Sequence, residues 1–191
     1  MKQVKTKYKP KEIVEQELEA KIKESKKVIY CVTSRLEIVK AKELIKAIDN
    51  FDFTNYTEFV YCGYGEPTCA LEKLLESGKY LKSLYPEMKI RLNTNGLGNL
   101  YHKKNIIPEL STVVDRVSIS LNAPTAKKYQ TVTRPQFDNA FEAMLDFASL
   151  SNQTFEHTQL SIVDVLPSDE IKQCQQIADK LGIYLKIRHY S

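Results

Sequence analysis

The feature that most constrains the fold is a regular alternation of short β-rich runs and helical patterns. Six β-rich runs begin near residues 28, 58, 88, 116, 160 and 183. Each gap between them holds apolar residues at the spacing of a helix with one buried face. Such alternation implies parallel strands joined by right-handed crossovers. The sequence therefore predicts an α/β fold.

Two architectures fit this alternation, an open doubly wound sheet and a closed or partial (β/α) barrel. The strands mix polar and apolar residues, as in Ser118-Ile119-Ser120 and Arg91-Leu92-Asn93. A central strand covered on both faces is more uniformly apolar, so the mixture favours polar side chains that face an interior ligand. We expect a partial (β/α)6 TIM-like barrel with an N-terminal helical extension.

The first 27 residues differ in composition from the rest of the chain. Residues 1–9 are rich in lysine and contain no acidic residue, and a helical pattern with a narrow apolar stripe runs from Pro10 to about Lys26. These residues are predicted to form a basic arm and an amphipathic helix. The barrel domain is predicted over residues 28–191.

Charge and cysteine usage narrow the class of protein. The net charge is +4 on 28 basic and 24 acidic residues, and its excess lies mostly in the first 27 residues, so nucleic acid is an unlikely partner. No apolar run approaches the roughly 20 residues that span a bilayer, so no membrane is expected. The four cysteines are widely spaced and follow no secretory leader, which predicts a soluble cytoplasmic protein with reduced thiols.

The second strand runs into the stretch Cys62-Gly63-Tyr64-Gly65-Glu66-Pro67-Thr68. Glycines let another molecule approach the main chain closely, and a proline fixes the exit of the turn. Glu66 is therefore expected at the mouth of a strand, with backbone amides around it. The same pattern also fits an ordinary turn from strand to helix with a solvated glutamate.

The other strand ends carry amides, hydroxyls and glycine. The third strand, predicted over residues 88–92, runs into the polar turn Asn93-Thr94-Asn95-Gly96, and the fourth ends at Ser120-Leu121-Asn122. Such groups suit a polar, largely uncharged ligand such as a nucleoside. Loop ends also carry residues that could meet an anionic group or be surface charges: Arg35, Arg134, Arg188 and His189.

The segments CGYGEPT, IRLNTNG, VSISLNAP and IRHY, in this order and spacing, resemble the radical S-adenosylmethionine (SAM) superfamily, and within it the TatD-family-associated radical SAM proteins. The resemblance spans residues 36–190. It implies a partial barrel of radical SAM type that binds SAM at the carboxyl ends of the strands, with the glycine-rich motif receiving the amino group of the methionine. The SAM-binding residues that it implies are Gly63, Tyr64, Gly65, Glu66, Pro67, Asn93, Asn95, Ser118, Ser120 and Asn122.

One part of the family pattern is missing. Radical SAM enzymes hold a [4Fe-4S] cluster through three cysteines of a CxxxCxxC loop after the first strand, with one iron left open to SAM. Here Leu36 stands where the first of these cysteines would be, and Cys31, Cys62 and Cys69 are not spaced to replace the loop. No catalytic residue or metal ligand is assigned, and we expect that this chain alone does not cleave SAM reductively.

Three functions remain open at this point. The first is a radical SAM domain that binds SAM, with radical catalysis only if cluster ligands come from elsewhere. The second is a non-catalytic relative that binds a nucleoside or a partner protein. The third is a domain without a ligand, whose polar strand ends serve its fold alone.

Overall fold

The computed structural model describes residues 28–32, 41–63 and 65–189, with backbone alone for residues 28–32 and 41. The basic arm and the helix predicted over residues 10–26 lie outside the described residues. So do Arg35, Leu36 and Tyr64. The predicted boundary between the N-terminal arm with its helix, residues 1–27, and the domain over residues 28–191 therefore stays a prediction.

Six parallel strands form one sheet in the order β1-β2-β3-β4-β5-β6. Every strand lies beside its neighbour along the chain, so each pair follows a single crossover. The predicted alternation of strands and helices is confirmed. The strands are β1 (Val28–Val32), β2 (Glu58–Cys62), β3 (Lys89–Thr94), β4 (Arg116–Ser120), β5 (His157–Val163) and β6 (Tyr184–Arg188).

The predicted partial (β/α)6 TIM-like barrel of radical SAM type is wrong, because the sheet is open. In the described part of the chain β1 and β6 are its two edges and do not pair with each other. Some of the polar strand residues find partners on the sheet itself, although Asn93 Oδ1 is buried without a hydrogen-bond partner among the described residues. Arg91 and Arg116 lie 3.2 and 3.5 Å from the Glu58 carboxylate, so their polarity does not require an enclosed ligand.

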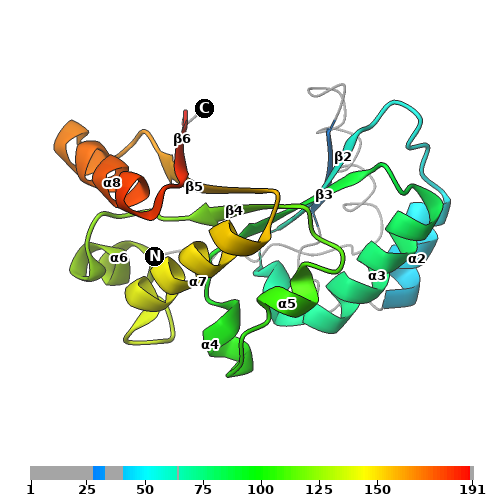
Figure 1. Ribbon diagram of the computed structural model, residues 1–191, viewed down its shortest axis with the longest axis horizontal. Coiled ribbons are helices and arrows are strands. Elements are labelled where there is room, and N and C mark those ends of the chain that lie inside the picture. Colours follow the sequence, from blue (N-terminus) through cyan, green and yellow to red (C-terminus); the bar gives the residue numbers. More distant parts are fainter. Residues whose placement is uncertain (1–27, 33–40, 64, 190–191) are drawn as a thin grey trace, which may run out of the picture.

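The helices follow from the strand order. Right-handed crossovers between successive neighbours place the connecting helices on the same face of a sheet, and Figure 1 shows α2, α3, α5 and α7 on one side. The helices are α2 (Ala41–Asp49), the 3-10 helix η1 (Pro67–Ala70), α3 (Leu71–Leu84), α4 (Gly98–His102), α5 (Ile107–Leu110), α6 (Ala126–Thr133), α7 (Ala140–Thr154) and α8 (Ser168–Leu181).

The hydrophobic core lies between this layer of helices and the sheet. Strand β3 shows the arrangement, because alternate residues point to opposite faces: Ile90, Leu92 and Thr94 are buried, whereas Arg91 and Asn93 are half-buried on the other face. Leu74 and Leu81 of α3 and Met144 and Phe147 of α7 are fully buried against the sheet. The core therefore fixes the carboxyl ends of β2, β3 and β4 relative to one another.

Several element bounds differ from the prediction. Strand β3 extends to Thr94, so Asn93 and Thr94 belong to the strand and not to a turn. Helices α4 and α6 were not predicted. Helix α8 begins at Ser168, with Pro167 at the N-cap position, and Gly182 ends the helix in the left-handed conformation.

None of the helices among the described residues is long and apolar enough to cross a membrane.

Candidate functional site

The loop after β2 is organised by the side chain of Glu66. Glu66 occupies the N-cap of η1, and Pro67 follows at the first helical position, where a proline costs no hydrogen bond. One carboxylate oxygen, Oε1, accepts hydrogen bonds from the Thr68 backbone N–H at 3.0 Å and from the Thr68 hydroxyl at 2.7 Å. A glutamate therefore satisfies the start of the helix locally, as N-capping side chains do.

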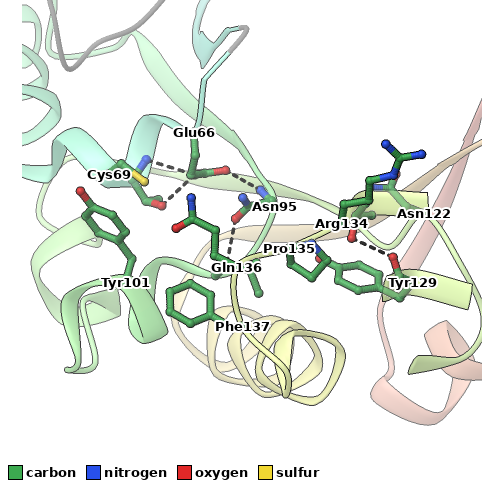
Figure 2. A pocket seen from close by; sticks show the side chains of 13 residues that line it. Glu66, Cys69, Asn95, Tyr101, Asn122, Tyr129, Arg134, Pro135, Gln136 and Phe137 are labelled. Carbon is green, nitrogen blue, oxygen red and sulfur yellow. Dashed lines mark hydrogen bonds between the residues drawn. The ribbon is translucent and has the colours of Figure 1, made fainter. Parts of the chain in front are cut away.

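The same carboxylate also reaches the end of β3. Oε1 accepts a hydrogen bond from the Thr94 hydroxyl at 2.6 Å, and Oε2 accepts one from the Asn95 backbone N–H at 2.7 Å. Figure 2 shows the side chains of Glu66 and Asn95 close together at one side of a pocket. Glu66 is thus the link between two strand ends that are adjacent in the sheet.

Burial raises the pKa of the Glu66 carboxyl above its usual value, while the hydrogen bonds from Thr94, Asn95 and Thr68 act in the opposite direction. These donors are hydroxyls and backbone amides, all of them neutral. No cationic side chain among the described residues forms an ion pair with Glu66. The charged form of Glu66 is therefore held by neutral groups alone.

The turn after β3 is tightly built. Asn95 Oδ1 accepts a hydrogen bond from the Leu97 backbone N–H at 2.9 Å, and Gly96 adopts a positive φ of 78°. Helix α4 then begins at Gly98, where a Cβ atom would lie 2.9 Å from the Thr68 hydroxyl oxygen and 2.7 Å from Ile106 Cδ1. The absence of a side chain at Gly98 lets α4 pack directly against the Glu66 loop.

A pocket of about 360 Å³ opens beside Glu66, between the loops that follow β2, β3 and β4 and the segment after α6. Figure 2 shows Cys69 and Tyr101 at one end of the pocket and Asn122, Tyr129 and Arg134 at the other. The lining residues are Glu66, Thr68, Cys69, Asn95, Leu97, Tyr101, Asn122, Tyr129, Thr133, Arg134, Pro135, Gln136 and Phe137.

The wall after α6 is held by backbone and amide contacts. Arg134 ends α6 in the left-handed conformation with a φ of 47°. The side-chain amide of Gln130 donates hydrogen bonds of 2.9 Å to the carbonyl oxygens of Phe137 and Asp138. These contacts fold the segment 134–138 back onto α6. Tyr129 is buried beneath it.

Three of the residues predicted for the site come together at this pocket, namely Glu66, Asn95 and Asn122. Gly63 and Gly65 are exposed in the loop before Glu66, and Pro67, which follows Glu66, is buried.

Asn93, Ser118 and Ser120 do not line the pocket. Asn93 and Ser118 are register partners on the sheet face away from the helices, where Gln159 donates a hydrogen bond of 3.0 Å to the Ser118 hydroxyl.

Several lining residues were not predicted. Thr68 follows the proline of the turn, and the Glu-Pro-Thr order was the signal that could have indicated a capped helix start. Tyr101 and Tyr129 lie on α4 and α6, the two helices that the sequence pattern did not reveal. Arg134 was noted as a loop-end cation, and the structure places it at the pocket.

His189 lies away from the pocket, and Cys69 and Cys174 differ in their surroundings. His189 Nδ1 is 2.7 Å from Asp164 Oδ2, at the carboxyl ends of β6 and β5. Cys69 lines the pocket, whereas Cys174 is buried in α8, and burial raises the pKa of its thiol to about 11. Among the residues with described side chains, no group of three or more His, Cys, Asp or Glu is arranged to hold a metal ion.

Comparison with protein families finds a match over part of the chain. Residues 22–59 match a family of uncharacterised proteins conserved in bacteria, DUF2179. This segment covers β1, α2 and the start of β2, and it stops before Glu66. No curated protein matches the chain.

The resemblance to radical SAM proteins, including the TatD-associated group, is wrong, since the family comparison finds DUF2179 and no radical SAM family. The motif residues have local explanations. Glu66 caps η1, and Asn95 closes the turn after β3. Strand ends of parallel sheets need such capping and turn residues whatever they bind. The comparison with the [4Fe-4S] cluster loop of that family, which this chain lacks, rested on this resemblance alone.

Proposed function

We propose that this protein binds a small molecule that carries a primary ammonium group and a nucleoside-like ring system, with the ammonium group at Glu66. The observation that carries the proposal is the Glu66 carboxylate at the pocket wall, which has four neutral hydrogen-bond donors and no cationic partner among the described residues. S-adenosylmethionine is our candidate ligand, because it combines both groups.

An ammonium group would complete this arrangement. A buried carboxylate without a countercharge is disfavoured, and a nearby cation favours its charged form. Oε1 already accepts three hydrogen bonds, whereas Oε2 accepts one, from Asn95. Since a carboxylate oxygen has two lone pairs, Oε2 has capacity for a further donor. The ammonium nitrogen is proposed to bind there.

The rest of the pocket suits a flat ring that bears hydrogen-bonding groups. Tyr101 and Phe137 supply aromatic surface, and Asn95, Asn122 and Gln136 supply amides. Aromatic walls with a few convergent polar groups are typical of small-molecule sites, and a volume of about 360 Å³ lies within their usual range of about 300–1,000 Å³.

The proposal is for ligand binding and assigns no reaction. A partner protein that senses the occupied pocket would give such binding a regulatory use. The widely spaced cysteines of the sequence lead us to propose the cytoplasm as the compartment.

Calorimetric titration with SAM and with its N-acetyl derivative tests the proposal, because acetylation replaces the ammonium group with a neutral amide and leaves the rest of the molecule unchanged. We expect SAM to bind and the N-acetyl compound to bind at least about tenfold more weakly, the loss expected for a buried charged contact. The affinity for SAM should rise with pH as Glu66 loses its proton, because the charged carboxylate is the form that binds a cation.

The variant Glu66→Gln tests whether the Glu66 carboxylate contributes to SAM binding. It should weaken SAM binding by about 5- to 100-fold, a loss of roughly 1 to 3 kcal/mol. Glu142→Gln is the matched control, because Glu142 is an exposed glutamate of α7 that does not line the pocket. Equal binding of SAM and the N-acetyl compound, or unchanged affinity in Glu66→Gln, would overturn the assignment of Glu66. No binding of SAM, adenosine or methionine would overturn the proposed ligand class.

A further inference from the structure

Strand β6 forms an exposed edge of the sheet. Its one neighbour is β5, and no other strand in the described part of the chain pairs with it. Of its five residues Leu185 alone is buried. Tyr184 is 63% exposed and Ile187 is 42% exposed, so large apolar side chains remain in solvent on a strand that is free to take another neighbour.

The register identifies which backbone groups point outward. The Arg188 carbonyl accepts a hydrogen bond from the Asp164 backbone N–H at 3.0 Å, so the backbone groups of Arg188 point toward β5. Because successive residues of a strand alternate in this direction, the groups of Lys186 and Tyr184 also point toward β5. Those of Leu185 and Ile187 point away from the sheet, where they are available to an added strand.

The side chains of β6 differ between the two faces of the sheet. Lys186 and Arg188 are exposed on the same face, and neither forms an ion pair with another described residue. Leu185 and Ile187 lie on the opposite face, which is the face of the hydrophobic core. By the same alternation Tyr184 lies on the face of the two cations. An added strand would therefore meet Tyr184 and two cations on one face and the apolar side chains of Leu185 and Ile187 on the other.

We propose that the β6 edge binds an extended segment of a partner protein in which acidic and apolar residues alternate. Addition of a strand to an exposed edge is a recurring mode of peptide recognition, in which backbone hydrogen bonds give affinity and alternate side chains give specificity. The acidic residues lie beside Lys186 and Arg188, because opposite charges on neighbouring strands stabilise the pair. The apolar residues lie beside Ile187.

The charges of β6 argue against a second copy of this chain as the occupant. A twofold axis pairs identical strands in antiparallel orientation. Such a pair would bring the Lys186 and Arg188 side chains of the two copies together on one face, and like charges on neighbouring strands are destabilising. Lysines on edge strands commonly discourage self-association for this reason.

A labelled peptide of about six residues that alternates glutamate and valine tests the proposal by fluorescence anisotropy. A peptide with lysine in place of glutamate is the control ligand. We expect the glutamate peptide to bind and the lysine peptide not to bind. On binding, the amide protons of Leu185 and Ile187 should exchange more slowly with solvent, because they become hydrogen-bonded.

Two variants separate the contributions of backbone and charge. Ile187→Pro removes an outward N–H and no bond to β5, a position at which edge strands accept proline, and it should abolish binding. Lys186→Glu should weaken binding about fivefold or more, whereas Lys172→Glu on the exposed face of α8 should leave it unchanged. Should Ile187→Pro fail to fold, Lys186→Glu still decides the question.

Three results would overturn the proposal. They are absence of peptide binding at millimolar concentration, equal binding of the two peptides, and a dimer that forms without peptide and dissociates on Ile187→Pro. The last result would assign the edge to a second copy of this chain.

Discussion

The hydroxyl of Thr94, at the end of β3, donates a hydrogen bond of 2.6 Å to the carboxylate of Glu66, in the loop after β2. The same hydroxyl oxygen accepts a bond of 3.0 Å from the Gly96 backbone N–H. Thr94 thus fixes the carboxylate and the following turn together. It is a positioning residue for the proposed ligand site.

Thr94→Val should therefore lower the free energy of unfolding by about 1 to 3 kcal/mol, because it leaves the half-buried carboxylate of Glu66 with one donor fewer. It should also raise the pKa of Glu66 further, since the Thr94 hydrogen bond acts to lower it. Urea denaturation measures the first effect. Thr112→Val is the control, because the Thr112 hydroxyl is exposed and bonds a backbone carbonyl at the surface; an equal cost in both variants would contradict the role of Thr94.

The raised pKa of Glu66 predicts a dependence of stability on pH. In the window between its usual pKa and its raised value, the folded protein holds this proton more tightly than the unfolded chain. The contribution of Glu66 to the free energy of unfolding is therefore present at low pH and is lost as the pH rises through the raised pKa. Glu66→Gln should remove this dependence. Urea titrations of both proteins between about pH 4 and pH 8 measure it, and a difference between them that is constant with pH would refute the prediction.

Gly98 tests the contact between α4 and the Glu66 loop. Gly98→Ala would place a Cβ atom 2.7 Å from Ile106 Cδ1 and 2.9 Å from the Thr68 hydroxyl oxygen, and such crowding costs about 1 to 3 kcal/mol. Adding Ile106→Val removes the nearer atom and should recover part of the loss. Thermal or urea unfolding of the single and double variants gives the interaction energy.

Gly182→Asn is the matched control for Gly98→Ala. Gly182 has a φ of 65° and nothing within 4 Å of its missing Cβ, and asparagine tolerates this conformation. Gly182→Asn should therefore cost less than Gly98→Ala. The reverse order would show that crowding at Gly98 is relieved by small shifts.

Glu58 is the centre of the ion cluster on the sheet face away from the helices. Its side chain is 13% exposed, and that of its partner Arg91 is 16% exposed. Glu58→Gln leaves Arg91 and Arg116 without this countercharge and should lower the free energy of unfolding by about 2 kcal/mol, between the values typical of exposed and buried pairs. Glu156→Gln, at a side chain that is 51% exposed, should cost less than about 1 kcal/mol. Urea denaturation compares the two.

The sequence was informative about strands and less so about short helices. All six strands lie where β-rich runs predicted them, because their apolar residues alternate or run together over several positions. Helices α4 and α6 were missed, since α4 has five residues and α6 has a polar, β-branched sequence. Both depend on tertiary contacts, such as the burial of Tyr129.

The error in the fold class has a specific cause. Polar strand residues such as Arg91 and Ser118 were interpreted as facing an enclosed ligand, yet they pair with Glu58 and Gln159 on an open sheet. A sequence pattern shows that a position is polar, but it does not identify the residue with which that side chain forms a hydrogen bond or an ion pair.

The sequence allowed part of the candidate site to be predicted, namely the residues that directly follow strands. Glu66, Asn95 and Asn122 follow strands directly, and the carboxyl ends of parallel strands lie together at one edge. Their meeting at the pocket follows from the order of strands. The aromatic wall could not be predicted, because Tyr101 and Tyr129 reach the pocket through the two helices that the sequence did not reveal.

The strand order has a consequence for how the chain acquires its structure. Each strand from β2 to β6 lies beside the strand that precedes it in the sequence. During synthesis a strand can therefore dock as soon as its own crossover has emerged, because no pairing waits for a distant segment. The loops that carry Glu66 and Asn95 would then face each other once β3 is in place, before α7, β5, α8 and β6 have been made.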